Sequence, residues 1–187
     1  LIGDTSNLFP DPMMMDDSLY SGTISYVFGN NSENIAGSST RHLYILSGQT
    51  GEVLSAPIPV ERLLTYYVAS IMEVYGSGTG GPTLVARFFS NQAGTTQTGS
   101  DIIIGSTSST TWNRQAKNDV TAPSDASSMR LVFQQNVVGS TRHARFSEVV
   151  IRRSSSGELV VDGSIKANHL TTTSAVITGT AQIADAV

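Results

Sequence analysis

The sequence predicts an all-β protein, a jelly-roll β-sandwich followed by a short trimeric stalk segment with a brief helix. Charged residues make up only 14% of the 187 residues, so Ser, Thr, Gly and Asn supply most polar positions, as in β-rich proteins. About eight short segments with strand character are separated by Gly/Asn/Ser/Thr loops, which indicates a sandwich or jelly roll. The last thirty residues are apolar and too few to bury their own side chains, which predicts association with copies of themselves.

The predicted strands are marked by two-residue alternation of apolar and polar side chains, or by β-branched and aromatic content. They are residues 22–29, 41–46, 61–75, 83–90, 101–104, 112–120, 129–134 and 144–153. In the strand at 129–134 the alternation places Met129, Leu131 and Phe133 on the inward face.

The segment 61–75 is ambiguous, because its apolar residues fit a helix as readily as a strand. Its β-branched and aromatic content favours a strand. With 76–82 as the connecting loop, it is expected to form a long antiparallel hairpin with 83–90. The loop contains the pattern G-x-G-x-x-G, but Pro82 and a strand follow it where a dinucleotide site requires a helix, so we interpret it as a hairpin loop.

The composition argues against several classes of function. The chain has no Cys, so disulfides, thiolate metal sites and thiol catalysis are excluded. A net charge of −4 argues against nucleic-acid binding, which needs a basic surface to neutralise phosphates. No run of about 18 apolar residues is present, so no membrane insertion is expected. The start at Leu1, without Met or a basic leader, suggests a fragment of a longer protein.

Four arginines gather around the last predicted strand, at Arg142, Arg145, Arg152 and Arg153. Charged side chains on an edge strand discourage pairing with another sheet. We therefore expect these arginines to solvate an exposed sheet edge rather than to bind phosphate.

No catalytic site, metal centre or cofactor is predicted. His42, His143 and His169 lack the spacing of zinc ligands. We place His169 near the stalk axis, where three copies would meet and respond to pH. No Ser lies in G-x-S-x-G, and no spaced pair of carboxylates is found. A structural calcium ion is left open, with oxygen ligands from Asp4, Asp11, Asp16, Asp17 and Glu148.

Aromatic side chains are the strongest candidates for a binding surface, because ring faces stack on sugar rings while Asn, Gln and Arg bind the hydroxyls. The candidates that would line one such face are Tyr26, Tyr44, Tyr67, Arg87, Phe89 and Trp112. Aromatic residues make up only 7% of the chain, so most are also needed in a core. Trp112, the only Trp, is favoured as a core anchor.

Residues 7–153 resemble carbohydrate-binding-module-like jelly-roll domains, and the resemblance implies one such domain over 1–153. These domains open with the phrase N-L-[LF]-P-[ND]-P, which here is N-L-F-P-D-P at 7–12. Many close with F-D-D-V-x-I, where this chain has F-S-E-V-V-I at 146–151. Ser147 stands where relatives often have Asp. The resemblance therefore gives less support to a calcium ligand at this position.

The tail at 158–170, E-L-V-V-D-G-S-I-K-A-N-H-L, is similar to the L-V-x-G-S-I-x-A-x-x-L/I segments of tailed-bacteriophage central tail fibres and lambda-like host-specificity (tail tip) proteins. This resemblance implies a homotrimeric fibre stalk over 154–187, with a short helix at 164–170 capped by Ser164. The apolar residues expected at the trimer contact are Val160, Ile165, Leu170, Val176, Ile177 and Ile183.

The resulting expectation is a structural and host-attachment module of a phage tail fibre or tail tip, without catalytic activity, located in the virion and acting at the host cell surface. Its expected partners are two further copies of the chain, other tail proteins, and a host glycan or outer-membrane receptor. The alternative is a carbohydrate-binding accessory module of a secreted bacterial hydrolase. A sugar-cleaving depolymerase is disfavoured, because it needs spaced carboxylates on a long repetitive β-helix.

Overall fold

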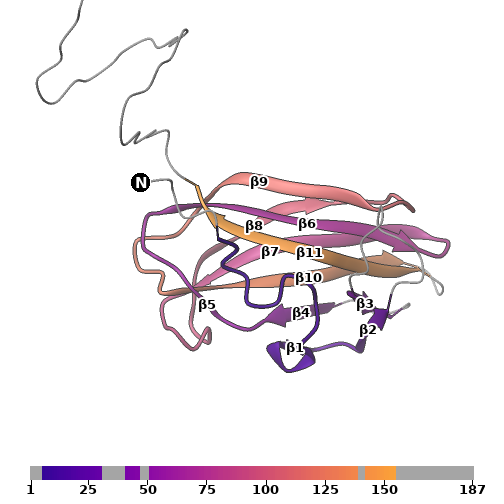
Figure 1. Cartoon of the computed structure of the whole chain (residues 1–187), viewed down its shortest axis with the longest axis horizontal. Coiled ribbons are helices and arrows are strands. Elements are labelled where there is room, and N and C mark those ends of the chain that lie inside the picture. Colours follow the sequence, from indigo (N-terminus) through magenta and orange to yellow (C-terminus); the bar gives the residue numbers. More distant parts are fainter. Residues whose placement is uncertain (1–5, 31–40, 47–50, 139–141, 155–187) are drawn as a thin grey trace, which may run out of the picture. The chain divides into compact units, whose positions relative to one another are not determined.

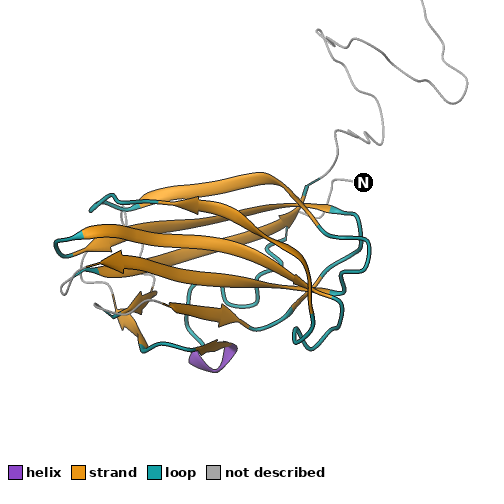
Figure 2. Cartoon of the chain, turned by 180° about the vertical axis from the view of Figure 1, so that it is seen from behind, coloured by secondary structure: helices purple, strands orange, loops and turns teal. Residues whose placement is uncertain are grey.

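Two antiparallel β-sheets pack face to face in the computed structural model, which describes residues 6–30, 41–46, 51–138 and 142–154 (Figures 1 and 2). Sheet A follows the order β1 (Tyr20–Gly22), β4 (Gly51–Ser55), β10 (Ser128–Val138), β7 (Thr79–Phe89) and β8 (Gln97–Ser106), and β5 (Ile58–Pro59) also pairs with β10. Sheet B follows the order β2 (Tyr26–Asn30), β3 (Arg41–Ile45), β11 (His143–Arg153), β6 (Thr65–Tyr75) and β9 (Asn113–Thr121). A 3-10 turn, η1 (Asp17–Leu19), precedes β1. The predicted jelly-roll β-sandwich is confirmed.

The core lies between the two sheets and is built by alternating inward side chains. Met129, Leu131 and Phe133 of β10 are fully buried, as their alternation predicts. Phe133 meets Phe146 of the opposite sheet edge-on, with ring centroids 5.1 Å apart and planes at 76°. This aromatic contact joins the centres of the two sheets.

The N-terminal segment at 7–12 extends sheet B along the second half of β11, beyond the residues that pair with β3. The Asn7 side chain accepts a hydrogen bond from the Ile151 N–H (2.8 Å) and donates one to the Val149 carbonyl (2.7 Å). The Leu8 N–H donates to the Ile151 carbonyl at 2.8 Å. The short opening phrase is therefore held against β11 by hydrogen bonds from the Asn7 side chain and from the backbone.

The predicted hairpin between 61–75 and 83–90 is wrong, although both segments are strands. β6 pairs with β11 and β9 in sheet B, whereas β7 pairs with β10 and β8 in sheet A. The turn at 76–78 carries the chain from one sheet to the other. Gly76 and Gly78 adopt φ angles of 97° and 140° there, which residues with a Cβ rarely reach. Alternation identifies a strand but not its partner.

The expectation that the four arginines line a sheet edge is also wrong, because β11 is the central strand of sheet B. Arg142 and Arg145 are 7% and 8% exposed. The Arg142 guanidinium donates to the carbonyls of Gly78 (2.6 Å) and Ser108 (3.0 Å), and Arg145 pairs with Glu73. Charged side chains can be buried on a central strand when each one has hydrogen-bond or ion-pair partners such as these. The exposed members of the group are Arg152 and Arg153.

Residues 155–187 lie outside the described residues, and so do the predicted stalk, its helix at 164–170 and its six trimer contacts. The same holds for Asp4 and His169. In the part of the chain that the structure describes, no helix combines the length and the apolar character needed to cross a membrane.

Candidate functional site

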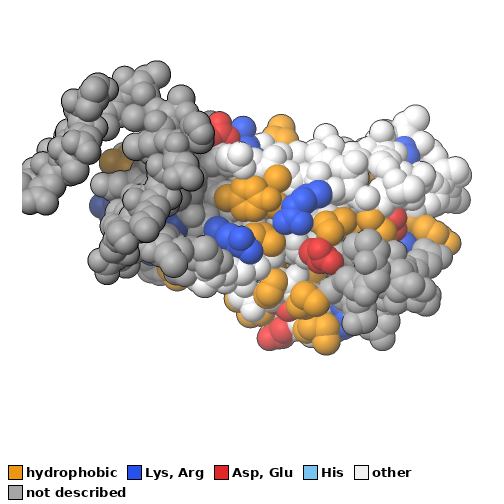
Figure 3. Space-filling view, turned by 45° about the horizontal axis from the view of Figure 1, so that its top comes forward, with side chains coloured by type: hydrophobic (Ala, Val, Ile, Leu, Met, Phe, Trp, Pro, Cys, Tyr) orange, Lys and Arg blue, Asp and Glu red, His pale blue; other side chains and the backbone are white. Residues whose placement is uncertain are grey.

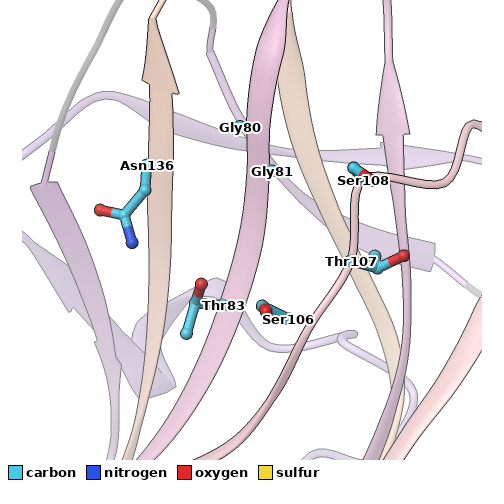
Figure 4. Close-up of a pocket in the computed structure, with 7 residues that line it drawn as sticks. All are labelled: Gly80, Gly81, Thr83, Ser106, Thr107, Ser108 and Asn136. Carbon is cyan, nitrogen blue, oxygen red and sulfur yellow. The ribbon is translucent and has the colours of Figure 1, made fainter.

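A pocket of about 380 Å³ lies on the outer face of sheet A, where β7, β8 and β10 run side by side. Asn136 stands on one side of β7 and residues 106–108 stand on the other (Figure 4). Thr83 and Ser106 are direct cross-strand partners. The lining residues are Gly80, Gly81, Thr83, Ser106, Thr107, Ser108 and Asn136. Their side chains offer hydroxyl and amide groups and no charge, so the pocket suits a neutral ligand with many hydrogen-bonding groups.

Gly81 shapes one wall of this pocket. It lies opposite Asn136 in the pairing of β7 with β10. A Cβ at Gly81 would overlap the Thr107 carbonyl oxygen, so Gly allows the segment after β8 to pack directly on β7. The Thr107 N–H donates to the Pro82 carbonyl at 3.2 Å, and this hydrogen bond keeps the two backbone segments close together. The wall is therefore formed by backbone contacts and exists without a ligand.

Farther along the same face, Arg87 of β7 lies between two carboxylates. Its guanidinium donates to both oxygens of Asp101 (2.9 and 2.7 Å) and of Glu52 (2.8 and 3.1 Å). The hydrogen bonds to Asp101, followed by those to Glu52, raise the pKa of Arg87 above its ordinary value. Bidentate bonds on both sides fix the side chain and link β4, β7 and β8.

Between the pocket and Arg87, three neighbouring strands carry apolar side chains. Val85 pairs with Val132 of β10 on one side and with Ile103 of β8 on the other. Ile103 is 62% exposed, whereas the two valines are buried. The face thus places an exposed apolar side chain beside the polar pocket, a combination that small-molecule sites use for contact and orientation.

The outer face of sheet B carries a cluster of rings, here called the aromatic cluster: His42, Tyr44, Tyr75, Trp112 and His143. Tyr44 stacks on His143 with ring centroids 4.6 Å apart, and Tyr75 lies 6.2 Å from the same imidazole. His42 lies 5.9 Å from both Tyr44 and Trp112. In the view of Figure 3, hydrophobic side chains are scattered over the surface with basic and acidic side chains between them.

A covered ion pair lies within this cluster. The Arg145 guanidinium meets the Glu73 carboxylate at 2.7 Å, and the two side chains are 9% and 8% exposed. Arg145 also lies over the ring of Tyr75, 4.1 Å from its centroid, and over that of Tyr44, at 5.2 Å. The cation is thus neutralised by one partner and covered by two aromatic faces.

The protonation states of the aromatic cluster follow from burial and from Arg145. Burial, followed by the charge of Arg145, lowers the pKa of His143 below its ordinary value. Burial raises the pKa of Tyr44, and the nearby guanidinium opposes the rise. Both rings are therefore neutral at pH 7, and they lie beside an ion pair whose charges balance.

The six sequence-predicted binding residues do not share one face. The outer face of sheet B holds Tyr44, Tyr67 and Trp112, sheet A holds Arg87 and Phe89, and Tyr26 packs against the core. Phe89 is only 5% exposed. Contacts through His42 bring Tyr44 and Trp112 into one cluster, so Trp112 is not the core anchor that its uniqueness favoured.

Sequence reasoning missed the pocket and three members of the aromatic cluster, His42, Tyr75 and His143. Tyr75 and His143 are direct cross-strand partners, a relation that a single sequence does not reveal. Thr83, Ser106 and Asn136 are residue types that occur throughout the chain. The usable signal was the glycine pair at 80–81, since consecutive glycines in a strand mark a close backbone approach.

Among the acidic residues considered for calcium, Asp11, Asp16 and Asp17 are engaged with the protein. The Asp11 carboxylate accepts hydrogen bonds from the Met15 N–H (2.7 Å), the Asp16 N–H (3.1 Å) and the Tyr20 hydroxyl (3.2 Å). Asp17 faces Arg41 at 3.5 Å. Among the described residues, no group of three or more His, Asp or Glu side chains is arranged to hold a metal ion.

Solved structures share this fold at low sequence identity. No protein-family model matches the chain, and no curated protein matches it. The C-terminal family 22 carbohydrate-binding module of Clostridium thermocellum Xyn10B is similar with a TM-score of 0.56 and 12% identity over 84% of this chain and 99% of that chain. A family 16 carbohydrate-binding module gives 0.54 and 11% identity over 69% of this chain and 86% of the other.

A phage protein has the same fold. The enzymatically active domain of bacteriophage CBA120 tailspike protein 4 is similar with a TM-score of 0.58 and 17% identity. The match covers 79% of this chain and 21% of that chain, so the sandwich corresponds to about a fifth of the tailspike structure. At these identities the likeness establishes the jelly-roll fold.

Proposed function

We propose that this chain is a non-catalytic carbohydrate-binding module. The observation that carries the proposal is the pocket on sheet A, whose lining offers hydroxyl, amide and backbone groups without a charge. A sugar presents several hydroxyl groups, each of which donates and accepts hydrogen bonds, and these match such a lining. The fold gives support, because similar structures include modules described as xylan-binding.

The surroundings of the pocket fit a neutral sugar better than an anion. Arg87 is held by Glu52 and Asp101, and the three groups together carry a net charge of −1. An anionic ligand on this face would meet the excess negative charge. The exposed Ile103 offers an apolar contact to the face of a sugar ring beside the pocket.

Asn136→Ala and Thr83→Val are each expected to weaken glycan binding about tenfold, because each removes hydrogen-bonding groups that face the ligand. The measurement is a glycan array that includes xylohexaose, followed by calorimetric titration of the glycans that bind. Asn118→Ala is the matched control, since it makes the same amide deletion at an exposed position of β9. Unchanged affinity in both pocket variants contradicts this site, and an array without any bound glycan contradicts the function.

A second candidate function is host attachment within a phage tail fibre or tail tip. The tailspike similarity favours it, together with the apolar tail at 154–187. In this proposal the tail forms a homotrimer, the module belongs to a virion, and a glycan or receptor on the host surface is its target. The apolar side chains of the tail require a partner, and three copies around one axis supply it.

The full chain is then expected to be a trimer in solution, and truncation after residue 154 is expected to give a folded monomer. Sedimentation equilibrium measures both masses, and circular dichroism checks that the truncated domain keeps its β-sheet signal. A full chain that remains monomeric at all concentrations contradicts the stalk. A truncated domain that is still trimeric places the association in the sandwich instead.

A further inference from the structure

The aromatic cluster spans neighbouring strands of sheet B, on the side of the sandwich opposite to the pocket. Tyr44, His143 and Tyr75 stand on β3, β11 and β6, which are consecutive in the sheet. Neighbouring strands lie about 4.8 Å apart, so the three rings form a row comparable in width to one or two sugar rings. Tyr75 is 47% exposed, and Tyr44 and His143 are partly exposed.

The polar groups within this row are already engaged. Arg145 and Glu73 satisfy each other at 2.7 Å and are covered by the rings. A partner on this surface therefore meets the exposed parts of uncharged rings and displaces water from them without breaking a protein ion pair.

We propose that the aromatic cluster is a second carbohydrate-binding site, on which the C–H groups of a neutral pyranose contact the exposed parts of the Tyr75, His143 and Tyr44 rings. The inference rests on the proposed function for its ligand class, but it concerns a separate site on the other sheet. With one site on each face of the sandwich, a single module contacts two glycan chains at once, and the chains need not be parallel. A fibre that carries several modules multiplies these contacts and gains avidity.

Trp112 makes this site observable, because it is the only Trp in the chain and lies 5.9 Å from His42 in the cluster. Its fluorescence therefore reports on sheet B, while calorimetry reports on both sites. The probe is xylohexaose, a chain of neutral pyranose rings. In the wild type, the emission of Trp112 is expected to change and saturate as xylohexaose is added.

The variants separate the two sites. The double variant Asn136→Ala/Thr83→Val is expected to keep the Trp112 response, because those side chains belong to the pocket. Tyr75→Ala is expected to weaken the response about tenfold. Tyr75→Phe keeps the ring and is expected to retain the response, because the ring rather than its hydroxyl makes the contact. Tyr67→Ala, on the same face but outside the cluster, is expected to leave it unchanged.

Three outcomes overturn the inference. If calorimetry detects xylohexaose binding while Trp112 emission stays constant, the second site is wrong and the pocket stands. If emission changes in the wild type and is lost in the pocket variant, one site on sheet A explains all binding. If emission depends on protein concentration and not on xylohexaose, the aromatic cluster is a contact between copies of the chain.

Discussion

Phe146→Ala is expected to lower the free energy of unfolding by about 3–5 kcal/mol. The side chain is fully buried on the central strand of sheet B, and its ring meets Phe133 of sheet A edge-on at 5.1 Å. Truncation removes this contact and leaves a cavity between two sheets that are each held by cross-strand hydrogen bonds and cannot collapse freely. Urea denaturation followed by far-UV circular dichroism measures the loss.

Val27→Ala is the control for Phe146→Ala, because Val27 lies on the same sheet but is 47% exposed. Its substitution is expected to change the free energy of unfolding by no more than about 0.5 kcal/mol. If Phe146→Ala costs less than about 1 kcal/mol, the two sheets do not pack against each other at this position.

Sequence reasoning recovered the strands wherever alternation was strong. In β10, Met129, Leu131 and Phe133 recur every second residue, and all three are buried. The aromatic and β-branched content of 65–75 outweighed a helical spacing because such side chains pack well on a pleated sheet. Local pattern carries this information, since the side-chain period is a property of the strand itself.

Pairing could not be predicted in the same way, because it depends on contacts between distant segments. β6 and β7 are neighbours in sequence and lie in different sheets, while β10 and β11 each pair with strands from much earlier in the chain. The same limit explains the arginines. From the sequence, Arg145 was expected to be exposed. Its partner Glu73 lies opposite it only because β6 pairs with β11. The partner of a charge decides whether it can be buried.

The candidate sites were predicted in part for the same reason. Ring stacking singled out Tyr44 and Trp112 by chemistry, and the fold brings them together. The pocket was not predicted, because Thr83 and Asn136 become neighbours only through the pairing of β7 with β10. Whether any of these residues binds a ligand stays a prediction.

The second large effect is expected at the covered ion pair. Arg145→Met is expected to lower the free energy of unfolding by about 3–5 kcal/mol, because it leaves the Glu73 carboxylate buried without its cation. Urea denaturation at pH 7 measures the change. Arg153→Met is the matched control, since the Arg153–Glu61 pair is exposed, with side chains 46% and 58% accessible. Arg153→Met is expected to lower the free energy of unfolding by no more than about 1 kcal/mol.

The double variant Arg145→Met/Glu73→Leu distinguishes two reasons for the instability of Arg145→Met, a buried unpaired charge and the loss of contacts with the rings. If the cost comes from an uncompensated buried charge, removing both charges restores most of the stability, because a hydrophobic pair of similar volume fills the site without a desolvation penalty. If the double variant is as unstable as Arg145→Met, the guanidinium contributes mainly through its contacts with Tyr44 and Tyr75. The ring positions then depend on the cation, and the double variant would also lose the Trp112 response to xylohexaose. Retained stability with a retained response would instead show that the ion pair and the ring surface are independent features of sheet B.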